Sequence, residues 1–81
     1  MRIYIGSLAY GYKPEEFRAF LVSKGINLLN EISFPRNDNG LRPFVFIDVP
    51  DSEGEKNIKE LHGEVFAGRP LKVSDAHPRQ T

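Results

Sequence analysis

The sequence contains no cysteine and carries no net charge. Without cysteine there is no disulfide framework, no thiolate zinc site and no thiol nucleophile. The 11 basic and 11 acidic residues balance, so total charge does not point to a polyanionic partner. The chain is also short, at 81 residues, which predicts one small domain with little interior in which to enclose a substrate.

Long apolar runs are missing as well. The longest apolar stretches fall far short of the roughly 20 residues that a membrane span needs, so we expect no membrane partner. The chain enters a strand pattern at Arg2, which leaves no room for a secretory signal. With 40% hydrophobic and 27% charged residues, the composition is that of an ordinary globular protein. We therefore expect a cytoplasmic protein.

Motifs for catalysis and metal binding are also absent. The two histidines, His62 and His77, have no ligand partner at a suitable spacing and are predicted to be surface residues. Gly6 and Gly11 have the spacing of a phosphate-binding loop, but Tyr12 and Lys13 follow where lysine and serine or threonine are needed. The sequence therefore predicts no enzyme, no cofactor and no metal.

What the chain does contain is an alternation of strand and helix patterns. Strand patterns cover residues 2–6, 28–34, 42–49 and 69–74. A first helix begins at Pro14 and ends at Gly25, and a second follows a capping box of Ser52 and Glu55 and ends at Gly63. The dipeptide Asn39-Gly40 predicts a hairpin between the second and third strands.

The resulting order is β-α-β-β-α-β. Right-handed crossovers then place both helices on one face of a four-stranded antiparallel sheet. The predicted fold class is α+β, ferredoxin-like. We expect residues 1–76 to form the domain and residues 77–81 a short polar tail.

Aromatic residues gather on the side of this sheet that has no helix. Strand alternation gives Ile3, Ile5, Val45, Ile47 and Val49 to the helix-covered face, because these aliphatic residues match Leu71 and Val73. It leaves Tyr4, Phe44 and Phe46 on the open face, and we call these three residues the aromatic platform. Arg2, Arg42 and Lys72 flank it. Stacking of an unpaired base on such a ring contributes roughly 1–3 kcal/mol.

The other aromatic residues have structural explanations. Phe34 is predicted to join the core together with Ile32. Phe66 is predicted to pack over the second helix, and Tyr12 to cover the first. Tyr10 lies in a loop and has no predicted role.

Three segments carry a resemblance to a known family. The third strand reads Arg42-Pro43-Phe44-Val45-Phe46-Ile47-Asp48-Val49, which resembles the RNP octapeptide of the RNA recognition motif. The segment Ile3-Tyr4-Ile5-Gly6-Ser7-Leu8 resembles the RNP hexapeptide of that family. Leu61-His62-Gly63 and Gly68-Arg69-Pro70-Leu71-Lys72-Val73 resemble the ending of its domains. The similarity spans residues 2–76 and is greatest to small single-domain members from bacteria.

The resemblance implies a binding function and assigns roles to residues. By it, Tyr4 with Phe44 or Phe46 would stack two or three bases of single-stranded RNA, and single-stranded DNA would bind more weakly. Arg42 would bind a phosphate, with Arg2 beside the platform. Lys72, Ser74 and the backbone through Ala76 would contact the outer bases. The protein would act as a monomer and as an RNA chaperone or post-transcriptional regulator.

Several residues depart from the family pattern. Pro43 replaces glycine, Val45 replaces glycine or alanine, and Val49 replaces an aromatic residue, but no stacking ring is lost. Two acids, Asp48 and Asp75, oppose a polyanion. The charge is distributed unevenly, because residues 51–64 hold five acids against two lysines and leave the remainder net positive. We expect modest affinity and a shallow salt dependence.

Two other functions remain open at this stage. An RNA recognition motif fold can serve as a protein–protein interaction module, which the neutral charge and the two acids favour. A small ferredoxin-like enzyme of the acylphosphatase kind shares the strand order, although no phosphate-binding loop with a suitable arginine is visible. RNA titration, protein pull-down and an acyl-phosphate hydrolysis assay separate the three.

Overall fold

The computed structural model describes residues 1–9, 11–38 and 40–76. Tyr10, Asn39 and the predicted polar tail, which includes His77, lie outside the described residues. The order of the main elements agrees with the predicted alternation, with two helices packed on an antiparallel sheet. Neither helix in the described ranges has the length and apolar character that crossing a bilayer would require.

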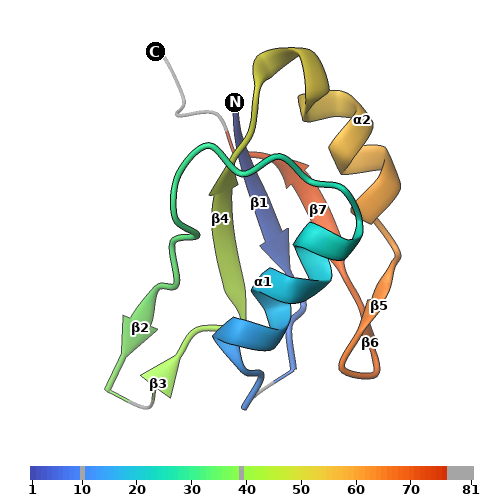
Figure 1. The fold of residues 1–81 in the computed structure, drawn as a ribbon. Coiled ribbons are helices and arrows are strands. Elements are labelled where there is room, and N and C mark those ends of the chain that lie inside the picture. Colours follow the sequence, from blue (N-terminus) through green and yellow to red (C-terminus); the bar gives the residue numbers. More distant parts are fainter. Residues whose placement is uncertain (10, 39, 77–81) are drawn as a thin grey trace.

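Three strands form the central sheet, and the first strand of the chain lies in its middle. β1 (Arg2–Gly6) pairs antiparallel with β4 (Phe44–Asp48) on one side and with β7 (Lys72–Asp75) on the other. Figure 1 shows β1 between these two neighbours, with α1 crossing in front of the sheet. The registers set Tyr4 opposite Phe46 and opposite Ser74. Segments that are distant in the sequence therefore meet around Tyr4.

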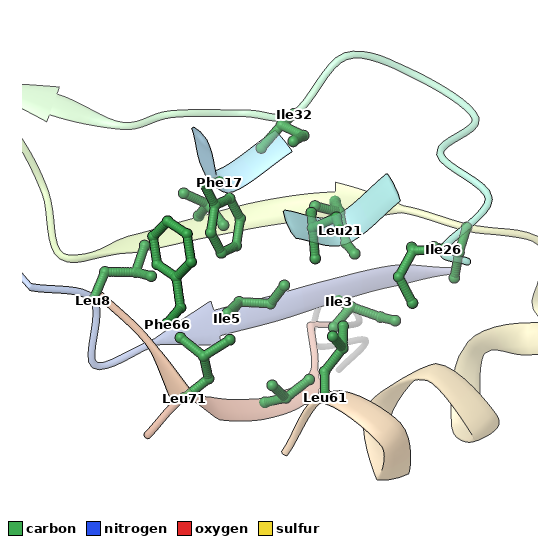
Figure 2. Packing of buried hydrophobic residues seen from close by; sticks show 14 of the residues in the cluster. Ile3, Ile5, Leu8, Phe17, Leu21, Ile26, Ile32, Leu61, Phe66 and Leu71 are labelled. Carbon is green, nitrogen blue, oxygen red and sulfur yellow. The ribbon is translucent and has the colours of Figure 1, made fainter. Parts of the chain in front are cut away.

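One face of this sheet carries the core. The aliphatic residues assigned to it by alternation are all buried, namely Ile3, Ile5, Val45, Ile47, Val49, Leu71 and Val73. They pack with Phe17 and Leu21 of α1 and with Leu61 of α2 in a single cluster, part of which Figure 2 shows. Both helices thus supply apolar side chains to the same face of the sheet, as predicted.

The first helix follows its sequence signals closely. α1 (Pro14–Ser23) has proline at its start and Glu15 and Glu16 in its first turn, where the positive helix end favours acids. After it, Gly25 adopts φ +78° and donates its N–H to the carbonyl of Val22. A left-handed residue at this place ends a helix at low cost only when it is glycine.

The second helix begins earlier than predicted. α2 (Asp51–Leu61) starts directly after Pro50, so Ser52 already lies inside its first turn, and no side chain among the described residues caps it. The predicted capping box of Ser52 and Glu55 is therefore wrong. Gly54, which weakens a helix on propensity grounds, has a packing role here. A Cβ atom at Gly54 would lie 1.8 Å from Sδ of Met1, so the glycine makes room for that side chain.

The fourth strand is incomplete. Ser33 exchanges two hydrogen bonds with Phe46 of β4, at 2.9 and 3.2 Å, and forms an isolated bridge there. Continued pairing would place Glu31 opposite Asp48, but it is Leu29 that donates to the Asp48 carbonyl, at 2.9 Å. The chain therefore holds two extra residues in this stretch and bends at Leu29 and Asn30 to accommodate them. Residues 28–34 follow β4 without forming a regular strand.

Two short hairpins complete the fold. β2 (Arg36–Asn37) pairs with β3 (Gly40–Leu41), where the sequence predicted a hairpin. β5 (Val65–Phe66) pairs with β6 (Arg69–Pro70) through Ala67 and Gly68, both with positive φ. The predicted last strand is thus divided at Leu71 into β6 and β7. The tight turn before Arg69 explains why, because it commits Arg69 and Pro70 to pair with β5.

The structural aromatics occupy the core side. Phe34 packs against the core cluster, as predicted. The ring of Tyr12 is buried against Phe17, with centroids 6.2 Å apart, so Tyr12 covers the first helix. Phe66 is buried in the same cluster as Leu61 of α2, and its ring also contacts Phe17 and Phe20 of α1, each at 5.1 Å. Figure 2 shows Phe66 beside Phe17.

Candidate functional site

The aromatic platform lies on the face of the sheet opposite the core. Tyr4 comes from β1, and Phe44 and Phe46 come from β4, where they alternate with buried Val45 and Ile47. The ring centroid of Tyr4 is 5.7 Å from that of Phe44 and 5.8 Å from that of Phe46, and the two phenylalanines are 5.7 Å apart. The structure thus brings the three predicted rings into one contact cluster.

The three rings are inclined to one another and are partly exposed. Tyr4 and Phe44 differ by 32° in plane, whereas Phe44 and Phe46 meet edge to face at 78°. Such tilted and edge-to-face contacts are the favoured geometries of aromatic pairs. Each ring shields its neighbours from water while keeping part of its own surface accessible. The platform is therefore a faceted surface, with Tyr4 and Phe44 the closest to a common plane.

Gly6 allows the Tyr4 ring to lie close to the sheet. A Cβ atom at Gly6 would fall 2.3 Å from the Tyr4 hydroxyl oxygen and within 2.8 Å of two ring carbons. Gly6 follows Tyr4 by two residues and therefore shares its face of β1. The ring occupies the space that any other residue at position 6 would fill. Sequence reasoning placed Gly6 at the end of a strand and in the RNP-like hexapeptide, and it missed this contact.

Arg2 and Asp48 form an ion pair at one end of the platform. They are direct cross-strand partners, and Nε of Arg2 donates to Oδ1 of Asp48 at 3.2 Å. Nδ2 of Asn30 donates to Oδ2 of the same carboxylate at 3.1 Å. These hydrogen bonds, first from Arg2 and second from Asn30, hold the pKa of Asp48 below its usual value. The acid predicted to oppose a polyanion is thus neutralised by a neighbour.

The same arginine also touches the platform. Cζ of Arg2 lies 5.8 Å from the centroid of the Phe46 ring, within the range of a cation–π contact. Asn30 was not singled out from the sequence. The available signal was an asparagine inside a predicted strand, a residue that favours turns and local hydrogen bonds.

Arg42 occupies the opposite end of the platform. Its Cζ lies 5.7 Å from the centroid of the Phe44 ring. Arg42 precedes β4, and its backbone N–H bonds to the carbonyl of Pro35. No carboxylate among the described residues pairs with its guanidinium. The two predicted arginines therefore both lie beside a platform ring, but only Arg2 is held by an acid.

The predicted residues of the last strand lie along the edge of the platform. Ser74 is exposed and stands opposite Tyr4, and Lys72 is exposed and stands opposite Gly6. Ala76 follows β7, and its N–H is already bonded to the carbonyl of Arg2 at 2.9 Å. Its N–H is therefore not available to a ligand.

Two other predicted positions lie away from the platform. Asp75 borders a surface depression with Met1, Asp51, Ser52 and Glu55, on the side of α2. Its alternation with Ser74 explains this, because Asp75 shares the face of buried Val73. Asp75 therefore lies on the other side of the sheet from the aromatic platform. His62 is exposed, as predicted, and its Nδ1 accepts the N–H of Val73 at 3.1 Å.

Metal ligation finds no support in the described part of the chain. No three histidine, aspartate or glutamate side chains gather there as a potential cation site. The chemistry offered by the platform is instead that of aromatic faces, guanidinium groups and an ammonium group. These groups suit a flat, anionic ligand.

Comparison with known proteins agrees with this geometry. The family model described as RNA recognition motif matches residues 3–72. A relative from Nostoc sp., named "Putative RNA-binding protein RbpB", is 32% identical over 99% of this chain and 79% of its own length. The similarly named RbpA of Synechocystis sp. is 31% identical over 99% of this chain and 80% of its own length.

Solved structures show the same fold. The crystal structure of RNA Binding Protein PG1 matches with a TM-score of 0.79 and 26% identity, over 100% of this chain and 99% of that one. The Rna15 RRM with bound RNA matches with a TM-score of 0.77 and 19% identity, over 99% of this chain and 86% of that one. The matched family is one of binding modules and not of enzymes. The chain belongs to the RNA recognition motif family.

Proposed function

We propose that this protein binds single-stranded RNA by stacking bases on the aromatic platform, without a catalytic activity of its own. The observation that carries the proposal is the contact cluster of Tyr4, Phe44 and Phe46 on the open face of the sheet. Exposed rings attract unpaired bases because every base has an apolar π-face, and each stacked base contributes roughly 1–3 kcal/mol. The names of the relatives support RNA as the ligand.

The residues around the platform then have the following roles. Tyr4, Phe44 and Phe46 stack two or three bases or pack against a sugar. Arg42 binds a phosphate, since its guanidinium has no carboxylate partner among the described residues. Arg2 and Lys72 contribute positive charge, and Ser74 with the carbonyl of Ala76 contacts the outer bases. Single-stranded DNA binds more weakly, because it lacks the 2′-hydroxyl.

The functional unit is a single domain acting as a monomer in the cytoplasm. Residues 1–76 form that domain, and residues 77–81 form a polar tail. Residues 28–34 serve as the fourth strand of the sheet beside β4, and the two hydrogen bonds between Ser33 and Phe46 support this arrangement. The cellular role of the protein is that of an RNA chaperone or a post-transcriptional regulator. A binding module without catalysis acts either by keeping RNA unpaired or by covering a stretch of it.

Replacement of single platform rings tests the function. Phe44→Ala and Phe46→Ala should each weaken RNA binding about tenfold, which corresponds to the loss of one stacked base. The measurement is a fluorescence-anisotropy titration of short single-stranded RNA at low salt, because phosphate contacts weaken as salt rises. Unchanged binding in both variants contradicts the proposal. Binding of a protein ligand by the platform in place of RNA would instead favour the interaction-module function.

Phe20→Ala is the matched control for these variants. It removes the same ring from α1, where Phe20 packs against the core cluster and stacks with Phe17. This substitution should lower the free energy of unfolding. It should leave RNA affinity unchanged at temperatures where the variant is folded. An equal loss of RNA affinity in Phe20→Ala would show that ring removal acts through stability and not through stacking.

A further inference from the structure

The end of the platform nearest Asp48 holds a fixed set of hydrogen-bond donors. Arg2 uses Nε to bond Asp48 and lies 5.8 Å from the centre of the Phe46 ring. Asp48 is itself held by Asn30 through its second oxygen. An arginine at a strand end is ordinarily free to rotate, and each bond made by Asp48 reduces that freedom. The terminal amino groups of Arg2 therefore stay beside the Phe46 ring.

We infer that Arg2, positioned by Asp48 and Asn30, reads the edge of the base that stacks on Phe46 and selects guanine. The inference rests on the proposed function, because it needs a base on that ring. A guanidinium group carries only donors, so it favours base edges that present acceptors. Guanine presents two adjacent acceptors, O6 and N7, which match the two-pronged geometry of arginine.

The other bases match this group less well. Adenine presents N7 next to an amino group that is itself a donor, so one arginine prong would face a donor. Uracil presents carbonyl acceptors that an N3–H donor separates. Cytosine presents two adjacent acceptors, O2 and N3, but its single ring offers less surface than guanine for stacking on Phe46. The expected order of affinity at this position is guanine first, cytosine second, uracil third and adenine last. A well-formed bidentate pair discriminates by a factor of about ten or more against the wrong base.

Asp48 is a positioning residue in this account. Its carboxylate adds a negative charge to a face that binds a polyanion, which by itself weakens every RNA equally. Its bond to Arg2 costs affinity for RNA in general but makes one base preferred. This separates the role of Asp48 from that of a purely structural ion pair. Its removal should change the ratio of affinities between oligomers as well as their mean.

Arg42 provides an internal comparison. It lies at a similar distance from a platform ring, 5.7 Å from Phe44, but no acid among the described residues holds it. A free guanidinium follows the phosphate backbone and carries no base preference. Arg42→Lys should therefore shift the affinity for all oligomers alike, whereas Arg2→Lys should affect one base.

The experiment compares four oligomers: a short oligouridine, and the same oligomer with one central uridine replaced by guanosine, adenosine or cytidine. Fluorescence anisotropy gives the dissociation constant of each for the wild type and for Arg2→Lys, Asp48→Asn and Arg42→Lys. The wild type should bind the guanosine oligomer about tenfold more tightly than the adenosine oligomer. Arg2→Lys should abolish this ratio, because a lysine ammonium cannot make the two-pronged contact of a guanidinium.

Asp48→Asn should reduce the same ratio while strengthening the binding of oligouridine, because a negative charge is removed. Arg42→Lys should leave the ratio at its wild-type value. Equal affinity of the wild type for all four oligomers, or an unchanged ratio in Arg2→Lys, overturns the inference while leaving the proposed function in place. Failure of the wild type to bind any of the four overturns the proposed function itself.

Discussion

The two faces of one three-stranded sheet differ in almost every physical respect. On the helix side, Ile3 and Ile5 are fully buried and belong to the hydrophobic core cluster. On the open side, Tyr4 and its neighbouring phenylalanines are partly exposed, tilted against one another and bordered by arginines. The same two strands, β1 and β4, supply both faces through alternate residues. Stability and binding are therefore separated within a few ångströms by the pleat of the sheet.

This separation gives the open face freedom that a core does not have. The core face is filled by aliphatic side chains that two helices cover, so the fold does not need the rings on the opposite face. A ring that the core does not need can be tilted or exposed without loss of the fold. The comparison predicts that substitutions on the two faces act on different measurements, and three experiments test this.

The largest effect is expected from Ile5→Ala on the helix side. Ile5 is fully buried, so its truncation loses apolar burial and leaves a cavity, at a cost of about 2–5 kcal/mol in the free energy of unfolding. Urea denaturation measures this cost. Tyr4→Ala, one residue earlier and on the open face, is the control and should shift the unfolding midpoint far less. Similar shifts for the two variants would mean that the faces are not energetically distinct.

An intermediate effect is expected from Gly6→Ala on the open side. The added methyl group would lie 2.3 Å from the Tyr4 hydroxyl, so the ring must move away from the sheet. The backbone of Gly6 is ordinary extended strand, and the displaced atoms are the end of a side chain, so stability should change little. RNA affinity should fall several-fold, up to about the tenfold value of one lost stacking contact.

A double-mutant cycle shows whether Gly6 acts through Tyr4. In a Tyr4→Ala background there is no ring to displace, so Gly6→Ala should cause no further loss of RNA affinity. Anisotropy titration of the four proteins gives the coupling. Additive losses would show that the methyl group affects RNA directly and that Gly6 does not serve the ring.

The faces of the sheet were predictable from the sequence because strand alternation is a strict geometric rule. Val45 and Ile47 were assigned to the core and Phe44 and Phe46 to the open side, and the structure confirms both assignments. Helix ends marked by Pro14 and Gly25 were predictable for a similar reason, since each residue is suited to one backbone conformation. The relative placement of the three rings followed from the predicted order of the strands.

Interactions between distant segments were not predictable in this way. The bend at Asn30 breaks a pattern that resembles a strand, and the side chain of Asn30 there bonds to the carboxylate of Asp48, 18 residues away. The same holds for Gly54, whose place in a helix is explained only by the Met1 side chain against it. Local rules therefore predicted the elements, while the contacts between them needed the structure.

The smallest effect is expected when the pH is lowered, and it concerns the stability contributed by the ion pair of Arg2 and Asp48 on the open face. Hydrogen bonds from Arg2 and Asn30 depress the pKa of Asp48 in the folded state. The ion pair therefore stabilises the fold fully at pH values above about 3.9, the pKa of an aspartate in an unfolded chain. That contribution is lost as the pH falls through the lower folded pKa. The stability difference between the wild type and Asp48→Asn should therefore be present at neutral pH and shrink in acid, as measured by urea denaturation across this range.

The matched control is Val45→Ala, on the opposite face of the same strand. Its cost comes from lost apolar burial, which involves no titrating group, so its stability difference from the wild type should stay constant over the same pH range. Added salt should reduce the Asp48 difference as well, because Arg2 and Asp48 are both partly exposed. A difference for Asp48→Asn that is constant in both pH and salt would mean that the residue acts by packing. Its ion pair with Arg2 would then contribute nothing to the stability of the fold. The two faces of the sheet would in that case not differ in the kind of interaction that stabilises them at this end.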